Sequence, residues 1–436
     1  MNSTVNKDTT TNALEPQWLL DRRSSGRETY FNLPVPSAKD QSWRFASVLS
    51  EEIDAFKPAS TPDDSAIDYA LANSTLVEDS IAELIFVDDH LVQSKPLPKE
   101  FTDKGVFFLS LNDAIEKHSD ILEPYFLKDS TRLGSQKYFG LHASNAKAGA
   151  VLYVPKGVEI NKPISVYHWS NKEKGLICPH TLIIAEAQSN VSLIDVLAST
   201  THDNAGLSIS ASNLQVHPSA NVYRKVIQNF NAQSLSFQLD SAIADRDTQL
   251  ENIAINLGAA KARYENQIQI NGSGAHVTMY SLSVAEDTQE FDQRTFQTHN
   301  APNSVSDLLY KNALFDTSRT IFSGLIQVEE GAQQTDAYQT NRNLLLDPRA
   351  DANALPGLEI LANDVKCSHG ATTGNIDKDE LFYMLSRGIP HRVAMQLIVL
   401  GFFEEIIEKL GSDSLAENIR KLLEEKFASK IKPEPR

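Results

Sequence analysis

The sequence predicts a mainly β protein, with a parallel β-helix between an N-terminal α-rich domain and a C-terminal helical domain. Helical periodicity disappears after the first third of the chain, and alternating strand patterns separated by small polar turns replace it. At 436 residues the chain is too long for one simple core. We therefore expect three domains, at residues 1–135, 136–370 and 371–436.

The N-terminal region has mixed and partly helical patterning. Residues 65–74 (SAIDYALANS) and 111–126 (LNDAIEKHSDILEPYF) place apolar side chains three and four positions apart, which indicates amphipathic helices. Residues 80–94 and 105–111 lie between them and read as short strands. A loop with two prolines precedes both helices, at residues 32–45. The pattern predicts a small α-rich domain.

The central region consists of strand after strand, most of them with alternating apolar and polar residues, so that one face is buried. The predicted strands include AVLYVPKGVEI, PISVYHW, HTLIIAE, VSLIDVLA, GLSISASNLQV, NVYRKVIQNF, SLSFQL, ARYENQIQI, HVTMYSLSV and RTIFSGLIQV. Polar turns at residues 188–190, 218–221, 272–275 and 330–332 are spaced by about 30 residues or near twice that. Without helices between the strands, a βαβ fold is excluded.

A β-sandwich also fits many short strands. The turn repeat and the length of the region favour a β-helix instead. About eight rungs, at a spacing of ~4.8 Å, would form a rod of ~40 Å. Such a rod has open ends, which need capping domains or a partner.

The C-terminal region predicts three helices. Asp377 and Glu380 form a variant of the capping box, and Gly388 ends the first helix. Pro390 begins a longer helix that Gly411 closes, and a third helix follows over LAENIRKLLEEKFA. The apolar faces of these helices are wide for so short a segment. We expect them either to pack on each other and the rod or to dock a partner.

Composition limits the choice of partners and compartment. The formal charge of −17 argues against nucleic acid and against an anionic membrane surface. The most apolar run, residues 393–403, is too short to span a bilayer. The N-terminal sequence MNSTVNKDTTTN has no pattern of a secretory signal, and two distant cysteines cannot form a disulfide framework. We expect a protein of the reducing cytoplasm.

The sequence lacks the common catalytic motifs. It contains no P-loop, no G-x-S-x-G, no H-E-x-x-H and no C-x-x-C. Two Cys-x-His pairs are present, Cys178 with His180 and Cys367 with His369. In a strand each pair would share one face and could supply half of a site for a soft or borderline metal. The residues alone favour buried structural cysteines for both pairs, and a Cys-His nucleophile is less favoured still.

A second functional class is a carbohydrate-active β-helix enzyme, which sets carboxylates on an open groove. The candidate carboxylates would be Asp240, Asp245 and Asp247, or Asp287 and Asp292. Acidic residues in turns and on wet strand faces are far more often solvated surface. The absence of a secretory pattern also counts against this class.

One long segment is similar to a known family. Residues 358–407, LEILANDVKCSHGATTGNIDKDELFYMLSRGIPHRVAMQLIVLGFFEEII, closely resemble the C-terminal signature of the SufB/SufD family of the SUF iron–sulfur cluster assembly machinery. Residues 298–346 and 156–169 resemble the β-helix of that family. Residues 33–45 and 103–126 resemble the N-terminal domain of its SufD branch. The resemblance covers nearly the whole chain.

The branch is indicated by two positions. Members of the SufB branch carry a cysteine in the segment that matches residues 341–356, where this chain has three leucines. They also have an acidic motif where this chain has Cys367 and His369. The chain therefore resembles the SufD branch.

The resemblance implies a right-handed parallel β-helix whose edge joins the β-helix of SufB, in a complex that also holds the ATPase SufC. SufC would dock on the C-terminal helices, around Phe382, Tyr383, Arg387, Gly388 and Ile389. The chain itself would bind no nucleotide.

Cys367 and His369 would contribute to an iron or nascent cluster site shared with SufB. The resemblance thus implies a non-catalytic scaffold subunit, or, as an alternative, a stand-alone homodimer with a scaffold role. Cys178 and His180 match no motif and keep the structural interpretation.

Overall fold

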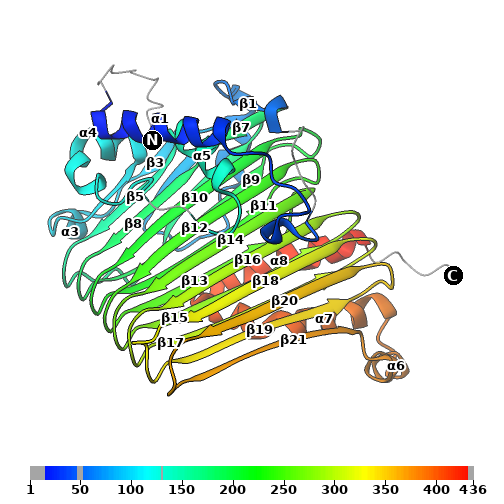
Figure 1. The fold of residues 1–436 in the computed structure, drawn as a ribbon. Helices are drawn as coiled ribbons and strands as arrows, with labels where there is room; N and C mark the ends of the chain where they lie inside the picture. Colours follow the sequence, from blue (N-terminus) through cyan, green and yellow to red (C-terminus); the bar gives the residue numbers. More distant parts are fainter. Residues whose placement is uncertain (1–14, 47–52, 129–130, 431–436) are drawn as a thin grey trace.

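The computed structural model describes residues 15–46, 53–128 and 131–430. Most of these residues form two long β-sheets that face each other and are linked turn by turn into one β-solenoid (Figure 1). Residues 1–14 and 431–436 lie outside the described residues, and so does the N-terminal sequence that bears on a secretory signal.

Each sheet contains a stack of eight parallel strands. From β8 and β9 onward every strand pairs with the one two places along the chain, whereas β5 pairs with β8 and β6 with β9. The first sheet, sheet A, stacks β5 (Gly149–Val154), β8 (His180–Ala185), β10 (Leu207–Val216), β12 (Leu235–Ala244), β14 (Lys261–Ile270), β16 (Glu290–His299), β18 (Arg319–Val328) and β20 (Asp351–Ile360). The second, sheet B, stacks β6 (Ile164–Ser170), β9 (Asn190–Ser199), β11 (Asn221–Asn229), β13 (Gln249–Asn256), β15 (His276–Ala285), β17 (Val305–Leu314), β19 (Asp336–Leu345) and β21 (Lys366–Asn375). The predicted β-helix is confirmed, with about eight turns.

The turns explain the polar repeat in the sequence. One corner of successive coils places a residue at positive φ, where small polar residues and glycine are tolerated best. These residues are Gln188, Ser219, Asp247, Gly274, Asn303 and Gln334. At five of these six corners the main-chain N–H group donates to a carbonyl group of the neighbouring coil, as Ser219 N does to Arg246 O at 2.8 Å.

The N-terminal region caps the first coil. Its helices are α1 (Gln17–Asn32), α2 (Asp64–Asn73), α3 (Lys99–Thr102), α4 (Leu111–Leu122) and α5 (Gln136–Asn145). Its strands are β1 (Lys57–Pro58), β2 (Ala82–Val87), β3 (His90–Lys95) and β4 (Phe107–Ser110). Strand β1 pairs with β7 (Gly175–Ile177). The predicted strands are confirmed as β2, β3 and β4, but they extend the solenoid. β2 pairs parallel with β6, and β4 pairs antiparallel with β5. The boundary predicted at residue 135 therefore does not separate the sheets.

The C-terminal region forms α6 (Lys378–Ser386), α7 (His391–Ile407), a short 3-10 turn (Glu408–Leu410) and α8 (Asp413–Lys430). The predicted N-cap at Asp377 and the glycines predicted to end two of the helices are confirmed. The Asp377 carboxylate accepts from the N–H groups of Asp379 and Glu380, and Gly388 and Gly411 adopt positive φ. The last strand runs to Asn375, past the boundary predicted at residue 370.

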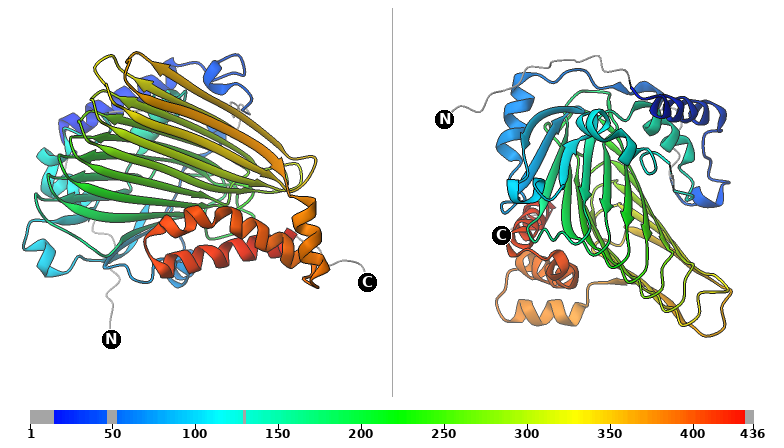
Figure 2. Two further views of the ribbon diagram at one scale, coloured as in Figure 1. Left: turned by 90° about the horizontal axis from the view of Figure 1, so that it is seen from below. Right: turned by 90° about the vertical axis from the view of Figure 1, so that its left-hand side faces the viewer.

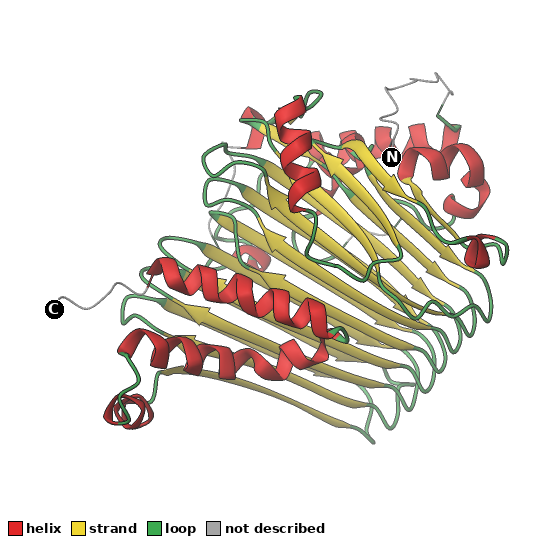
Figure 3. Ribbon diagram, turned by 180° about the vertical axis from the view of Figure 1, so that it is seen from behind, coloured by secondary structure: helices red, strands yellow, loops and turns green. Residues whose placement is uncertain are grey.

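Helices α7 and α8 lie side by side along the outer face of sheet B (Figures 2 and 3). Their buried side chains, among them Phe403, Ile406 and Phe427, pack against outward-facing residues of that sheet such as Ile253 and Leu282. Each large apolar side chain buried in this way contributes about 1.5–3 kcal/mol. Many of the apolar side chains noted in the sequence thus attach the helices to the solenoid. No helix in the described part of the chain is long and apolar enough to cross a membrane.

Candidate partner-binding and metal site at the last coil

The last coil of the solenoid has free edges. In the described part of the chain no strand pairs with the outer edge of β20 or of β21. Ile360 and Leu361 are 40% and 52% exposed there, whereas most residues of the middle strands are buried. The two ends of the solenoid therefore differ, because the N-terminal strands β2 and β4 pair with the strands of the first coil at the other end (Figure 1).

Cys367 and His369 both lie on this last strand and share one of its faces. Cys367 is in register with Ala337 and His369 with Gln339, and both of these partners on β19 are buried inside the solenoid. Side chains in register in a parallel sheet point to the same side. Cys367 and His369 therefore continue the inward-facing row of β19 to the open end.

The surroundings of the two side chains differ. Cys367 is half-buried against an apolar cluster that includes Ile326, Val328 and Ala337, whereas His369 is exposed. Burial raises the pKa of the Cys367 thiol and the Asp336 carboxylate raises it further, against a hydrogen bond from the main chain of Ala337. The thiol is therefore protonated at neutral pH, and binding a metal would release a proton.

The main chain of β21 is also available for pairing. Lys366 N donates to Thr335 O at 2.8 Å, so Lys366 directs its main-chain groups toward β19. These directions alternate along a parallel strand. Cys367, His369 and Ala371 therefore direct their N–H and C=O groups to the free edge, which is a template for another strand.

The metal-site prediction is incomplete within this chain. Among the described residues, no group of three or more His, Cys, Asp or Glu side chains could hold a metal ion. Cys367 and His369 thus form at most a two-ligand half site, and further ligands would have to come from outside the described part of the chain.

The other Cys-x-His pair is structural in its setting. Cys178 and His180 are 1% and 0% exposed, beneath the N-terminal elements, as the sequence predicted. Cys178 N donates to Asp89 Oδ2 at 2.7 Å, and His180 Nδ1 lies 3.0 Å from His142 Nε2. Both imidazoles are buried. Burial lowers the pKa of His142 to about 4 and lowers the pKa of His180 as well, so both imidazoles are uncharged at neutral pH.

The second predicted site lies on α6 and the turn after it. Phe382 and Tyr383 are 71% and 58% exposed, and α6 has no buried residue. Arg387 lies over the Tyr383 ring at 5.1 Å and donates to its hydroxyl at 3.2 Å. Gly388 is exposed and Ile389 is half-buried. Four of the five predicted residues are therefore exposed, and exposed aromatic side chains are typical of binding surfaces.

The carboxylates considered for a carbohydrate enzyme do not line one groove. Asp240 is buried against Arg224 at 2.8 Å inside the solenoid, and Asp292 is buried against Arg294 at 2.5 Å on the outer face of sheet A. Asp245 lies 3.4 Å from the His217 ring, and Asp247 and Asp287 occupy turns. The geometry pairs Asp240, Asp245, Asp247 and Asp292 with basic groups rather than with one another.

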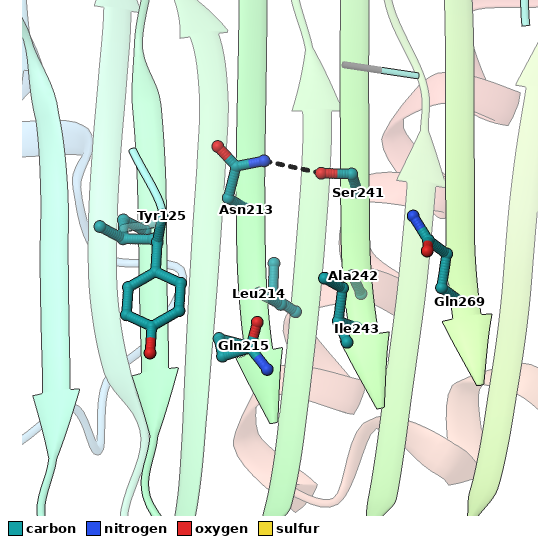
Figure 4. A pocket seen from close by; sticks show the side chains of 9 residues that line it. Tyr125, Asn213, Leu214, Gln215, Ser241, Ala242, Ile243 and Gln269 are labelled. Carbon is teal, nitrogen blue, oxygen red and sulfur yellow. Dashed lines mark hydrogen bonds between the residues drawn. The ribbon is translucent and has the colours of Figure 1, made fainter. Parts of the chain in front are cut away.

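A pocket at sheet A gives no better support to a carbohydrate-active enzyme (Figure 4). Tyr125, Asn213, Gln215, Ser241 and Gln269 line it together with apolar residues, and none of the lining residues is acidic. Asn213 donates to Ser241 across the pocket at 2.7 Å. Its volume of about 20 Å³ leaves room for about one water molecule and not for a sugar ring.

The described part of the chain is thus a β-solenoid whose last coil has unpaired strand edges and, beside it, exposed aromatic side chains. The chain matches the model "SUF system FeS cluster assembly, SufBD core domain" over residues 168–402 and the model "SufBD protein N-terminal region" over residues 10–166. The core match covers more than half of the chain. This chain belongs to the SufBD family of the SUF iron–sulfur cluster assembly system.

Relatives align over most of their length. Iron-sulfur cluster assembly protein SufD of Bacillus subtilis is 27% identical over 417 residues, 94% of each chain. SufD of Escherichia coli is 27% identical over 395 residues, 88% of each chain. Protein ABCI7, chloroplastic, of Arabidopsis thaliana is 25% identical over 412 residues, 91% of this chain and 84% of that protein.

Proposed function

We propose that this chain is a non-catalytic scaffold subunit for iron–sulfur cluster assembly, whose last coil pairs edge to edge with the β-helix of a SufB subunit. One observation carries the proposal. Cys367 and His369 lie on the inward face of a strand with an unpaired edge, and the described residues provide no third ligand. A second chain that adds a strand to this edge would bring its own ligands next to these two.

The ligand types suit the cargo. A thiolate and a neutral imidazole bind iron and the irons of a cluster, and a cluster needs further ligands to be held. Iron and the cluster are here the material that is assembled and passed on. His369 is exposed and Cys367 is half-buried, so an incoming chain would contact the imidazole more fully than the thiol.

SufC is the proposed partner of the C-terminal surface. Phe382 and Tyr383 offer large aromatic anchors, and Arg387 offers a guanidinium beside them. Because the chain has no phosphate-binding loop, the proposed complex would obtain its ATPase activity from this partner.

The test is co-expression of this chain with SufB and SufC of the same organism, followed by purification and analysis of iron and sulfide. We expect Cys367→Ala and His369→Ala to leave the complex intact and to lower the cluster content at least fivefold. The matched control is Ser368→Ala, because Ser368 lies between the two residues on the opposite face of β21. Normal clusters in both variants would make Cys367 structural, and failure of the three chains to associate would reject the proposed partners.

A stand-alone homodimer is the second candidate, because the same free edge, with Ile360 and Leu361 exposed, would accept a second copy. Light scattering on the chain purified alone and together with SufB separates the two. A dimer that persists in excess SufB, and that binds no SufC, would favour the homodimer over the mixed complex.

A further inference from the structure

A cavity unrelated to the last coil lies between the outer face of sheet B and the turn that joins α7 to α8. Its volume is about 280 Å³. Lys225 and Tyr223 of β11 and Glu251 of β13 line it from the sheet, and Lys409 and Ser412 line it from the turn. Small-molecule sites in proteins begin at about 300 Å³, so the cavity is near the lower limit of that class.

Lys225 is the unusual residue of this cavity because it is only 3% exposed. Its ammonium nitrogen lies 3.3 Å from Glu251 Oε1 and 5.2 Å from the centre of the Tyr223 ring. Its neighbours in register are Ile194 and Ile253, which offer no polar atom in their side chains. Burial lowers the pKa of Lys225 while Glu251 acts in the opposite direction.

The cavity as a whole carries more positive than negative charge. Two of the lining residues are lysines, Lys225 and Lys409, and one is acidic, Glu251, in a chain whose formal charge is −17. The Lys409 ammonium group also lies 5.8 Å from the centre of the Tyr280 ring. Hydroxyl groups of Tyr223 and Ser412 add hydrogen-bond donors. The cavity wall also includes Ile194, which would contact an apolar group.

We propose that this cavity binds a small organic anion that joins one carboxylate or phosphate group to a short apolar part. A single negative charge would balance the excess of one ammonium group. The oxyanion would lie between Lys225 and Lys409, and the apolar part would contact the Ile194 side of the cavity. The partial positive charge at the start of the 18-residue helix α8, next to Ser412, adds to the same preference.

The test is calorimetric titration of the full chain with phenyl phosphate and, separately, with phenylacetate. We expect saturable binding of one molecule per chain by at least one of the two, with an affinity that falls as sodium chloride is added. The more tightly bound probe identifies the charged group. Benzyl alcohol is the neutral probe and is expected to bind at least tenfold more weakly.

Two variants locate the binding. Lys409→Gln changes an exposed side chain and is expected to weaken binding about tenfold, which corresponds to about 1.4 kcal/mol. The double variant Lys225→Met with Glu251→Gln removes the buried pair together, so that neither charge is left alone, and is expected to abolish binding. Lys421→Gln on α8 is the control, because Lys421 lies outside this cavity.

Three results would overturn the proposal: no saturable binding of either probe at millimolar concentration, equal binding of benzyl alcohol, or unchanged affinity in both cavity variants. Lys409→Gln keeps the test decisive if the double variant does not fold. Because the cavity is distant from Cys367, failure here leaves the assembly proposal untouched, and the reverse also holds.

Discussion

His168 is a buried polar residue without a hydrogen-bond partner among the described residues. It is 3% exposed, faces the interior of the first coil, and stacks on Phe86 with ring centres 4.9 Å apart. Burial lowers the pKa of His168 to about 3, so the imidazole is neutral in the folded chain. An unpaired buried polar group costs about 1–3 kcal/mol.

His168→Phe is therefore expected to raise the free energy of unfolding by about 1–3 kcal/mol at pH 7.5. The new ring keeps the stack on Phe86 and leaves no polar atom unpaired. Urea denaturation, followed by far-ultraviolet circular dichroism, measures the change. A lower stability of this variant would mean that the imidazole is hydrogen-bonded in solution.

The pH dependence gives an independent check. The unfolded chain protonates this histidine near pH 6.5, whereas the folded chain does so only near pH 3. Protonation of His168 therefore costs no stability above pH 6.5. As the pH falls below that value, it lowers the free energy of unfolding by about 1.4 kcal/mol per pH unit. The gain from His168→Phe is expected to grow between pH 7.5 and pH 5. A gain that is the same at pH 7.5 and at pH 5 would contradict the lowered pKa of this buried imidazole.

At the residue scale, the sequence predicted that Cys367 and His369 lie on the same face of a strand, because that depends only on the alternation of side chains along the strand. It could not predict that Arg224 is buried between Asp195 at 3.0 Å and Asp240 at 2.8 Å, since these residues lie on three different strands. The pairing of Lys225 with Glu251 was missed for the same reason. Charges buried in a solenoid are matched between coils, and one sequence does not reveal the register.

At the scale of elements, Lys311 connects the C-terminal helices to the solenoid. It projects from β17, is almost fully buried, and its ammonium group lies 2.6 Å from Glu405 Oε2 and donates to Phe402 O at 2.8 Å. Lys311→Met keeps much of the apolar stem but removes the charge-assisted bonds. We expect a loss of about 1.5–3 kcal/mol in unfolding free energy and faster hydrogen exchange in α7, measured by mass spectrometry.

Glu405→Gln is the matched control for this contact. Glu405 is about half exposed, so its removal is expected to cost less than about 1 kcal/mol. The bond from Lys311 to Phe402 O would survive in this variant. Unchanged exchange of α7 in Lys311→Met would show that apolar packing alone holds the helices.

The exposed aromatic side chains of α6 lead to a prediction on partner binding. Phe382→Ala is expected to weaken binding of SufC by about 2 kcal/mol, roughly 30-fold in Kd, because a large exposed aromatic side chain would form the centre of the contact. Titration calorimetry with purified SufC measures it. Lys378→Ala, on an exposed residue of the same helix, is expected to change Kd less than twofold, and equal effects of both variants would reject this surface as the dock.

The positions of most strands and helices could be predicted from the sequence, because residue alternation and the helix caps at Asp377, Gly388 and Gly411 are local signals. Membership in a sheet did not follow. Strands β2 and β4 were assigned to a separate domain, yet they extend the two solenoid sheets. Their pairing with β6 and β5 depends on contacts across many residues, which strand propensity does not encode.

At the scale of the whole molecule, the fold and the proposed function meet at the free edge of β21. Proline is tolerated in an edge strand where the lost N–H faces outward, and it breaks the ladder where the N–H faces the neighbouring strand. Ala371 directs its N–H to the free edge, whereas Thr372 directs its own toward β19. Proline at position 371 should therefore affect only binding at the free edge, whereas proline at position 372 should also affect folding.

Ala371→Pro is expected to leave the isolated chain folded, with a thermal midpoint within a few degrees of the wild type, and to abolish co-purification of SufB. Thr372→Pro is expected to lower the midpoint as well, because it removes a hydrogen bond to β19. Thermal denaturation of each chain alone and pull-down with tagged SufB provide both readouts. If Ala371→Pro binds SufB as the wild type does, the partners do not join by strand addition. The proposed site at Cys367 and His369 would then need its further ligands from another part of the proposed assembly.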